Sequence, residues 1–154
     1  MKTIKGIEIK NCNFDKFKKV ADLIYFDGPL LSHYVTDNGD NYLFYWLDQD
    51  DTDNRWLFAR IDNDMKQKFF KKELTLRKVL SSPLDIVYTV DIDNEGKHHN
   101  FQAHSIEDLP EDYLPAEDSY YEFEPEDVNK ENMSIAEMSG KKLDWFRKVC
   151  AAVL

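Results

Sequence analysis

The chain of 154 residues has few cysteines and glycines and no long apolar run. Its two cysteines, Cys12 and Cys150, lie near opposite ends without metal-site spacing, so we expect free thiols in a reducing compartment. The sequence has five glycines, and it contains no Gly-rich phosphate loop, nucleophile elbow or His-Glu-x-x-His helix. No stretch approaches the roughly 18 apolar residues of a membrane helix, and the first residues lack the apolar core of a signal peptide. The sequence therefore predicts a cytoplasmic protein that does not bind membranes.

Basic residues are absent from one long stretch of the chain. Between Ser105 and Asn129 there are ten acids and no Lys, Arg or His, whereas the other 20 acids are balanced by 20 bases. This segment therefore accounts for the formal net charge of -10. A field of a single sign repels nucleic acid and attracts basic protein surfaces. We expect no direct nucleic-acid binding and a protein partner with a basic surface.

The most aromatic stretch runs from Asn41 to Ile61 and consists of two apolar runs around an acidic turn. In the first run, both faces of an extended strand would be apolar, because successive side chains point to opposite sides. Such a pattern is typical of a central strand covered on both sides. The acidic turn favours chain reversal, so the second run is expected to return as the partner strand. Pairing of Trp46 with Trp56 or Phe58 would fix the register.

Turn and periodicity signals predict the elements around this pair. Asp27-Gly28-Pro29 and Asn38-Gly39 mark turns. Either Asp62 or Asn63 is the candidate cap of a first short helix, and Thr75 is the candidate cap of a second. A helical turn or a loop is expected at 11–19, and an edge strand within 3–10. Further strands are expected at 20–26, 30–36, 85–92 and 99–105. The predicted fold class is α+β, with an antiparallel meander of about five to six strands, short helices after the fourth strand and a C-terminal helix.

The last third of the chain changes in composition. Residues 106–130 combine three prolines and the ten acids with scattered large apolar side chains. Those apolar groups favour an ordered wrap over the sheet rather than a free segment. A capping-box pattern and an apolar face predict the C-terminal helix at 134–153. We expect a single domain, 1–154, whose sheet core with its helical insert spans 20–105.

Four motifs resemble an uncharacterised family of small acidic bacterial proteins. They are the Asp-Gly-Pro-Leu turn at 27–30, the Tyr-Leu-x-x-Trp strand at 42–46, the Arg-Trp-Leu strand at 55–57 and Leu-Thr-Leu-Arg at 74–77. The resemblance spans about 20–93 and departs from the family pattern after Arg77, where Lys and Val follow. It implies the strand order and a bacterial or phage cytosolic setting, and it implies no catalytic residue.

Two acidic turns and a histidine group are the candidate metal sites, and each pattern is incomplete. The turn at 48–54 lacks the Gly and Glu of a calcium loop, and the turn at 91–96 has Gln102 at the twelfth position. His99 and His104 would lie on opposite faces of a strand, while His98 and His104 would be about 20 Å apart on one face. We therefore expect hairpin turns and exposed histidines, with no metal and no cofactor.

The acidic segment gives the functional hypothesis, because aromatic rings supply binding energy and carboxylates supply steering and selectivity. It predicts a non-enzymatic protein-binding module of an immunity, inhibitor or defence-accessory type. The predicted partner-binding residues are Glu111, Asp112, Tyr113, Glu117, Asp118, Tyr120, Tyr121 and Glu122. In the competing interpretation, the rings pack on the protein's own sheet and the acids only face water. Two other functions remain open: a nucleic-acid mimic that inhibits a DNA-binding enzyme, and a metal-dependent hydrolase built from scattered Asp and His.

Overall fold

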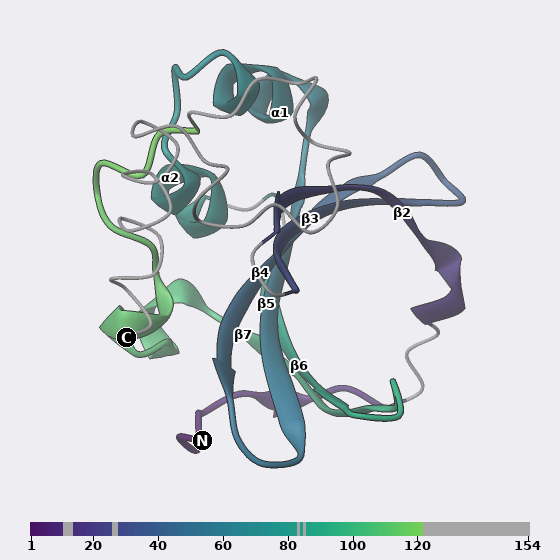
Figure 1. Cartoon of the computed structure of the whole chain (residues 1–154). Helices are drawn as coiled ribbons and strands as arrows, with labels where there is room; N and C mark the ends of the chain where they lie inside the picture. Colours follow the sequence, from purple (N-terminus) through teal and green to yellow (C-terminus); the bar gives the residue numbers. More distant parts are fainter. Residues whose placement is uncertain (11–13, 26–27, 83, 85, 122–154) are drawn as a thin grey trace.

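The computed structural model describes residues 1–10, 14–25, 28–82, 84 and 86–121. Its centre is a seven-stranded antiparallel sheet in the order β1-β7-β6-β5-β4-β3-β2 (Figure 1). From β2 to β7 each strand pairs with its neighbour in sequence, so this part is a meander, and β1 pairs with β7 at the far edge. The strands are β1 (Ile7–Glu8), β2 (Phe17–Tyr25), β3 (Pro29–Thr36), β4 (Asn41–Gln49), β5 (Asp53–Ile61), β6 (Val87–Asp93) and β7 (His98–His104).

The central pair β4 and β5 has the register that the aromatic pattern predicts. Trp46 lies opposite Trp56, which confirms the first of the two expected pairs, and Phe44 lies opposite Phe58. At the acidic turn, the Asp50 carboxylate accepts hydrogen bonds from the backbone N–H groups of Thr52 and Asp53, at 3.0 and 2.9 Å. The Asp50 side chain thus stabilises the hairpin connection through the backbone of the residues that follow it.

Two short helices follow β5 and lie on the same side of the sheet (Figure 1). They are α1 (Asn63–Phe70) and α2 (Leu76–Ser81). Asp62 caps α1 by accepting from the Met65 N–H at 2.7 Å, and Thr75 caps α2 by accepting from the Lys78 N–H at 3.0 Å. These bonds satisfy N–H groups that have no partner within the helix.

The sheet has an apolar cluster on each face. The helix-side core includes the fully buried side chains of Leu43, Tyr45 and Leu57 from the sheet together with Phe69 and the apolar face of α2. The opposite face has the smaller cluster of Phe44, Phe58 and Val90, with more aromatic rings packed around it. The expectation that both faces of the central strand are covered is therefore confirmed.

Three details differ from the prediction. The sheet has seven strands rather than five to six, because the edge strand expected within 3–10 joins the same sheet. For the same reason the helices follow the fifth strand of the chain, not the fourth. Strand β2 begins at Phe17, directly after the 3-10 turn η1 (Phe14–Lys16), because 17–19 pair with 34–36 of β3. The predicted C-terminal helix at 134–153 lies outside the described residues.

Among the described residues, none of the helices has both the length and the apolar character needed to cross a membrane.

Candidate functional site

Residues 105–121, which we call the acidic ledge, run along the helix side of the molecule (Figure 1). The ledge contains two 3-10 turns, η2 (Ile106–Asp108) and η3 (Glu111–Tyr113). Its end is tied to α2, because the Leu76 N–H donates to the Ser119 carbonyl at 2.9 Å and Thr75 forms an isolated bridge with Tyr120. Its buried side chains, Leu109, Tyr113, Leu114, Pro115, Ser119 and Tyr121, attach it to the domain. The predicted wrap is thus packed against the domain as far as 121, beside α2 rather than directly across the sheet.

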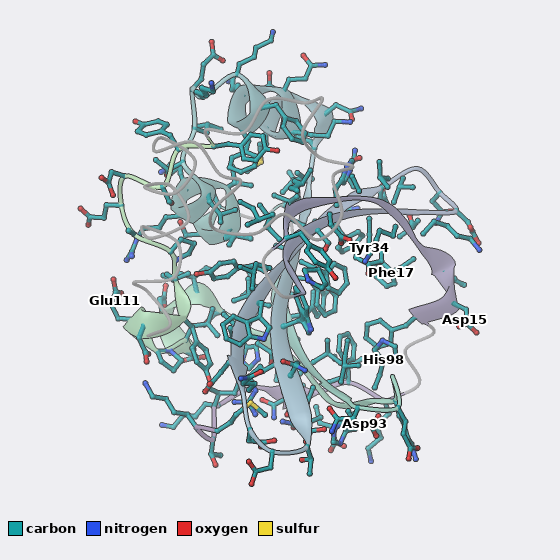
Figure 2. All side chains as sticks on the ribbon, viewed as in Figure 1. Asp15, Phe17, Tyr34, Asp93, His98 and Glu111 are labelled. Atoms are coloured by element: carbon teal, nitrogen blue, oxygen red, sulfur yellow. The ribbon has the colours of Figure 1, made fainter. Side chains whose placement is uncertain are left out.

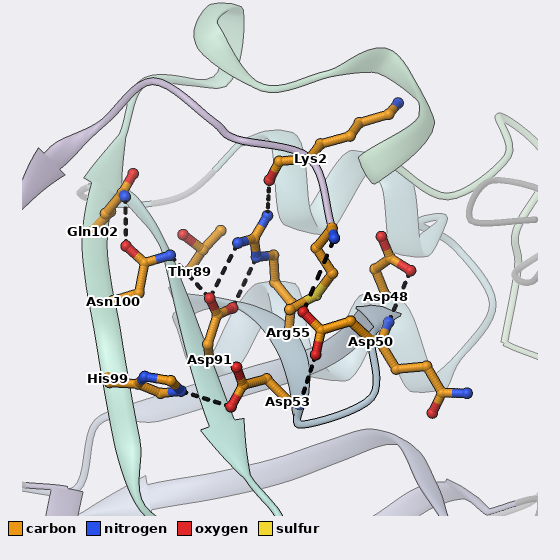
Figure 3. A network of polar contacts seen from close by, with 12 residues as sticks. Lys2, Asp48, Asp50, Asp53, Arg55, Thr89, Asp91, His99, Asn100 and Gln102 are labelled. Atoms are coloured by element: carbon orange, nitrogen blue, oxygen red, sulfur yellow. Dashed lines mark hydrogen bonds and ion pairs between the residues drawn. The ribbon is translucent and has the colours of Figure 1, made fainter.

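A buried ion pair attaches the ledge to the sheet. The Arg55 guanidinium in β5 donates to both carboxylate oxygens of Asp91 in β6, at 2.8 and 3.1 Å, and to the Tyr113 hydroxyl at 3.0 Å. It also donates to the Lys2 carbonyl, while the Asn100 amide donates to Asp91 at 2.9 Å (Figure 3). Burial alone would lower the pKa of Arg55, but the hydrogen bonds to Asp91 and Tyr113 raise it above its ordinary value. Arg55 therefore stays charged, and its buried charge is matched.

The three tyrosines predicted to bind a partner have different environments. Tyr113 is 2 % exposed and Tyr121 is 0 % exposed, whereas Tyr120 is 43 % exposed. The Tyr121 ring packs against Phe69 and Phe70 of α1, with centroids 5.1 and 5.4 Å away. Tyr113 and Tyr121 therefore belong to the core, as the competing interpretation expects, and of the three tyrosines Tyr120 is the one on the surface.

The predicted carboxylates lie on the outside of the ledge. Glu111, Asp112, Glu117 and Asp118 are all exposed. Glu111 pairs with Arg77 and Asp112 pairs with Lys2. The Arg77 guanidinium also donates to the Pro115 carbonyl at 2.9 Å. Arg77 therefore binds both a side chain and the backbone of the ledge. Glu122 lies outside the described residues.

The histidines contact structural partners rather than one another. The His33 ring lies 2.9 Å from the Asn41 amide oxygen, and His99 lies 2.7 Å from the Asp53 carboxylate. His104 lies 2.7 Å from both the Thr89 hydroxyl and the Lys5 carbonyl. At 3 % exposure, His104 contradicts the expectation of exposed histidines, because the segment that leads into β1 covers it. In the described part of the chain, no three His, Cys, Asp or Glu side chains form a group suited to a metal ion.

The opposite face of the sheet carries a feature that the sequence did not reveal. There the sheet surrounds a cavity of about 250 Å³, which we call the aromatic hollow. Its lining consists of Phe14, Phe17, Pro29, Ser32, Tyr34, Phe44, Trp56, Ile92 and His98. In Figure 2, Phe17 and Tyr34 lie on one side of this region and His98 lies on the other. In the sequence, the apolar second face of β4 was the one indication of the aromatic hollow. The alternation of side chains along a strand does not specify how strongly a sheet curls.

The fold and these two surfaces define a curled antiparallel sheet with two helices and an anchored acidic segment on one side. Comparison with protein-family models found no match, and neither did searches of curated proteins and of solved structures. The resemblance to small acidic bacterial proteins therefore remains a prediction.

Proposed function

We propose that the protein is a non-enzymatic binding module whose acidic ledge engages a basic surface of a partner protein. The main support is one combination within 105–121: the large apolar side chains are mostly buried, while every acid is exposed. These acids are Glu107, Asp108, Glu111, Asp112, Glu117 and Asp118. The ledge contains no Lys, Arg or His that would offset their charge within the segment.

Anchoring matters because a binding surface that is already ordered loses little conformational entropy when the partner arrives. The ledge is held by the Arg55 hydrogen bond to Tyr113, by the Arg77 hydrogen bond to the Pro115 carbonyl and by its backbone bond to α2. The carboxylates are therefore presented in a fixed arrangement, and Tyr120 adds an exposed ring beside them.

The protein's own bases neutralise only part of this charge. The ion pairs Glu111–Arg77 and Asp112–Lys2 involve exposed carboxylates, and exposed pairs contribute about 0–1 kcal/mol. The ledge acids are expected mainly to accelerate encounter with a basic partner and to select against acidic ones. We also propose a cytoplasmic setting, in line with the sequence.

The test compares two variants that remove the same amount of charge. The ledge variant combines Glu107→Gln, Asp108→Asn, Glu117→Gln and Asp118→Asn, and it leaves the acids paired with Arg77 and Lys2 intact. The control variant combines Asp37→Asn, Asp51→Asn, Glu73→Gln and Glu95→Gln, which are exposed acids elsewhere on the surface.

The measurement is capture of partners from lysate, followed by their identification and by direct binding with the purified partner. We expect the ledge variant to bind at least tenfold more weakly and the control variant to bind like the wild type. Binding should also weaken steeply as salt is raised, because exposed charges are screened. Unchanged binding by the ledge variant, or equal losses in both variants, would contradict the proposal. Competition by duplex DNA for the same partner would instead favour the nucleic-acid mimic.

A further inference from the structure

The two ends of the meander approach each other around the aromatic hollow. Phe14 in η1, just before edge strand β2, stacks on His98 at the start of β7. Their ring centroids are 4.2 Å apart and their planes differ by 4°. In the described sheet β2 and β7 do not pair with each other, so this ring contact connects the ends of the curve. The sheet curls around the hollow (Figure 1), and the Phe14–His98 contact connects the two ends of the curl.

A row of stacked aromatic rings begins at Phe44, which lines the aromatic hollow. Phe44 and Phe58 stack with centroids 4.4 Å apart and planes 5° apart, and Tyr88 continues the row at 5.2 Å from Phe58. Phe17 meets Phe44 nearly edge-on, at 84°. Stacked and edge-on contacts are the two favourable geometries for aromatic rings. Of these four rings, Phe17 and Phe44 line the hollow, and an added ring could pack on them.

The hollow is lined from η1 and from all six strands of the meander, with at least one residue from each. Its volume of about 250 Å³ exceeds that of a cavity of about 150 Å³ that takes up benzene. It is smaller than the roughly 300–1,000 Å³ of pockets for drug-sized ligands. The size therefore fits a compact molecule of one or two fused rings.

Among the described residues, the lining carries no acidic or basic side chain apart from His98. Partial burial lowers the pKa of His98, and nearby Asp15 and Asp93 oppose this effect only in part, so the imidazole is neutral at pH 7. Lys19 lies close to Tyr34, but it pairs with Asp22 at 2.9 Å. A charged ligand group would be desolvated in the hollow without an ionic partner, which is costly. The ligand is therefore expected to be uncharged.

A few polar groups lie among the rings. Ser32 uses its hydroxyl hydrogen on Asp22 at 2.7 Å and keeps oxygen lone pairs that can accept. Neutral His98 has one donor and one acceptor nitrogen. Within the described chain the Trp56 indole N–H makes no hydrogen bond, whereas the Trp46 N–H donates to Asn54 at 3.0 Å. An apolar cavity with a few polar groups is the usual composition of a small-molecule site.

We propose that the aromatic hollow binds an uncharged heteroaromatic molecule of one or two fused rings. The ligand packs between the rings of the lining and forms hydrogen bonds with His98 and Trp56. This site is separate from the acidic ledge: the ledge packs into the helix-side core, and the hollow lies at the other cluster. The inference therefore does not rest on the proposed partner binding.

The probes are indole-3-carboxamide and indole-3-carboxylate, which have the same ring system and nearly the same size but differ in charge. We would follow the tryptophan indole N–H signals by ¹⁵N NMR, assigned with single Trp→Phe variants. The carboxamide is expected to shift the Trp56 signal saturably and to shift the Trp46 signal less, because Trp46 lies beside Trp56 but does not line the hollow. The carboxylate is expected to bind at least tenfold more weakly. Equal binding of the two probes, or no saturable shift at Trp56, would overturn the proposal.

Two neighbouring histidines of β7 provide matched variants. His98→Phe keeps a ring that can stack on Phe14 but removes the polar nitrogens, and we expect it to weaken carboxamide binding at least fivefold. His99→Phe makes the same change at the next position, which does not line the hollow, and it should leave binding unchanged. Both side chains are exposed, so neither change should unfold the protein. If both variants bind the carboxamide like the wild type, or if His99→Phe has the larger effect, the assignment to the hollow is wrong.

Discussion

Arg55 and Tyr113 are 58 positions apart in the sequence, and the Arg55 guanidinium donates a 3.0 Å hydrogen bond to the Tyr113 hydroxyl inside the protein. This contact joins the sheet to the acidic ledge. Because Asp91 holds the same guanidinium at 2.8 Å, the position of the ledge depends on a buried ion pair in the centre of the sheet. Substitutions in the sheet should therefore change the proposed binding surface.

Tyr113→Phe tests this connection, because it removes the hydroxyl and keeps the buried ring. We expect a loss of about 1.5–3 kcal/mol in the free energy of unfolding, since a hydrogen-bond acceptor of a buried charged donor is removed. Hydrogen exchange should accelerate in the ledge, for instance at the Leu114 amide, more than in the sheet. Tyr120→Phe is the control, because that ring is 43 % exposed and its loss of a hydroxyl should have little effect. Equal effects of the two variants would show that the contact does not hold the ledge.

Asp91→Asn should be much more destabilising than the loss of a surface ion pair. It leaves the buried Arg55 charge without a charged partner, and breaking such a pair costs about 3–5 kcal/mol. Asp64→Asn is the control, because it breaks the exposed Asp64–Lys68 pair, for which we expect less than about 1 kcal/mol. Urea unfolding curves would measure both. A double variant, Arg55→Met with Asp91→Leu, should recover much of the stability if the unmatched charge is the cause.

The sequence predicted the elements whose signals are local. Asp62 or Asn63 and, for the second helix, Thr75 were identified as caps because a side-chain oxygen before a helical run binds N–H groups within three residues. The structure shows that Asp62 is the cap of α1. Asn38-Gly39 was identified as a turn because this pair was expected to supply two residues with positive φ. In the structure Gly39 has a φ of +85°, whereas Asn38 does not have a positive φ. The start of β2 was missed, since Phe17 and the lysines after it lack a strand pattern and become a strand by pairing with 34–36.

The site was predicted less completely, because its geometry depends on contacts between distant residues. The acids of the ledge could be recognised from composition, but the burial of Tyr113 and Tyr121 is decided by Arg55 and Phe69, which are far away in sequence. The aromatic hollow requires the sheet to curl until Phe14 reaches His98. Alternation along a strand shows that a face is apolar and does not show its curvature.

Gly6→Ala should loosen the edge of the sheet at β1. A Cβ atom at this position would lie 2.4 Å from Cε1 and 2.6 Å from Nδ1 of the His104 ring, which is buried and hydrogen-bonded on both sides. The ring cannot move aside easily, so we expect a loss of about 1–3 kcal/mol, the usual cost of overpacking. Lys5→Ala, at an exposed neighbouring position, should cost less than about 0.5 kcal/mol. Thermal unfolding of the two variants would check this, and equal stability would contradict the close packing of Gly6 on His104.

The stability of the protein should fall when the pH is lowered below the ordinary histidine pKa. Burial lowers the pKa of His33 and His104 from their ordinary value of 6.5, and neighbouring Lys66 and Arg55 act in the same direction. Hydrogen bonds from the His33 ring to the Asn41 amide oxygen and from the His104 ring to the Lys5 carbonyl oppose the shift without cancelling it. Below pH 6.5 the unfolded chain therefore binds more protons than the folded chain, and the free energy of unfolding decreases as the pH falls.

Urea midpoints measured between about pH 8 and pH 5 would show this decrease, a range that lies mostly above the titration of ordinary carboxylates. The variant His33→Gln/His104→Gln is expected to be less stable at pH 8, because it disturbs two buried hydrogen-bonded sites, and to depend less on pH below 6.5. The decisive quantity is the slope of the free energy of unfolding against pH. Disturbed packing or lost hydrogen bonds alone would lower the free energy of unfolding equally at every pH. A double variant with the wild-type slope would show that other groups cause the pH dependence.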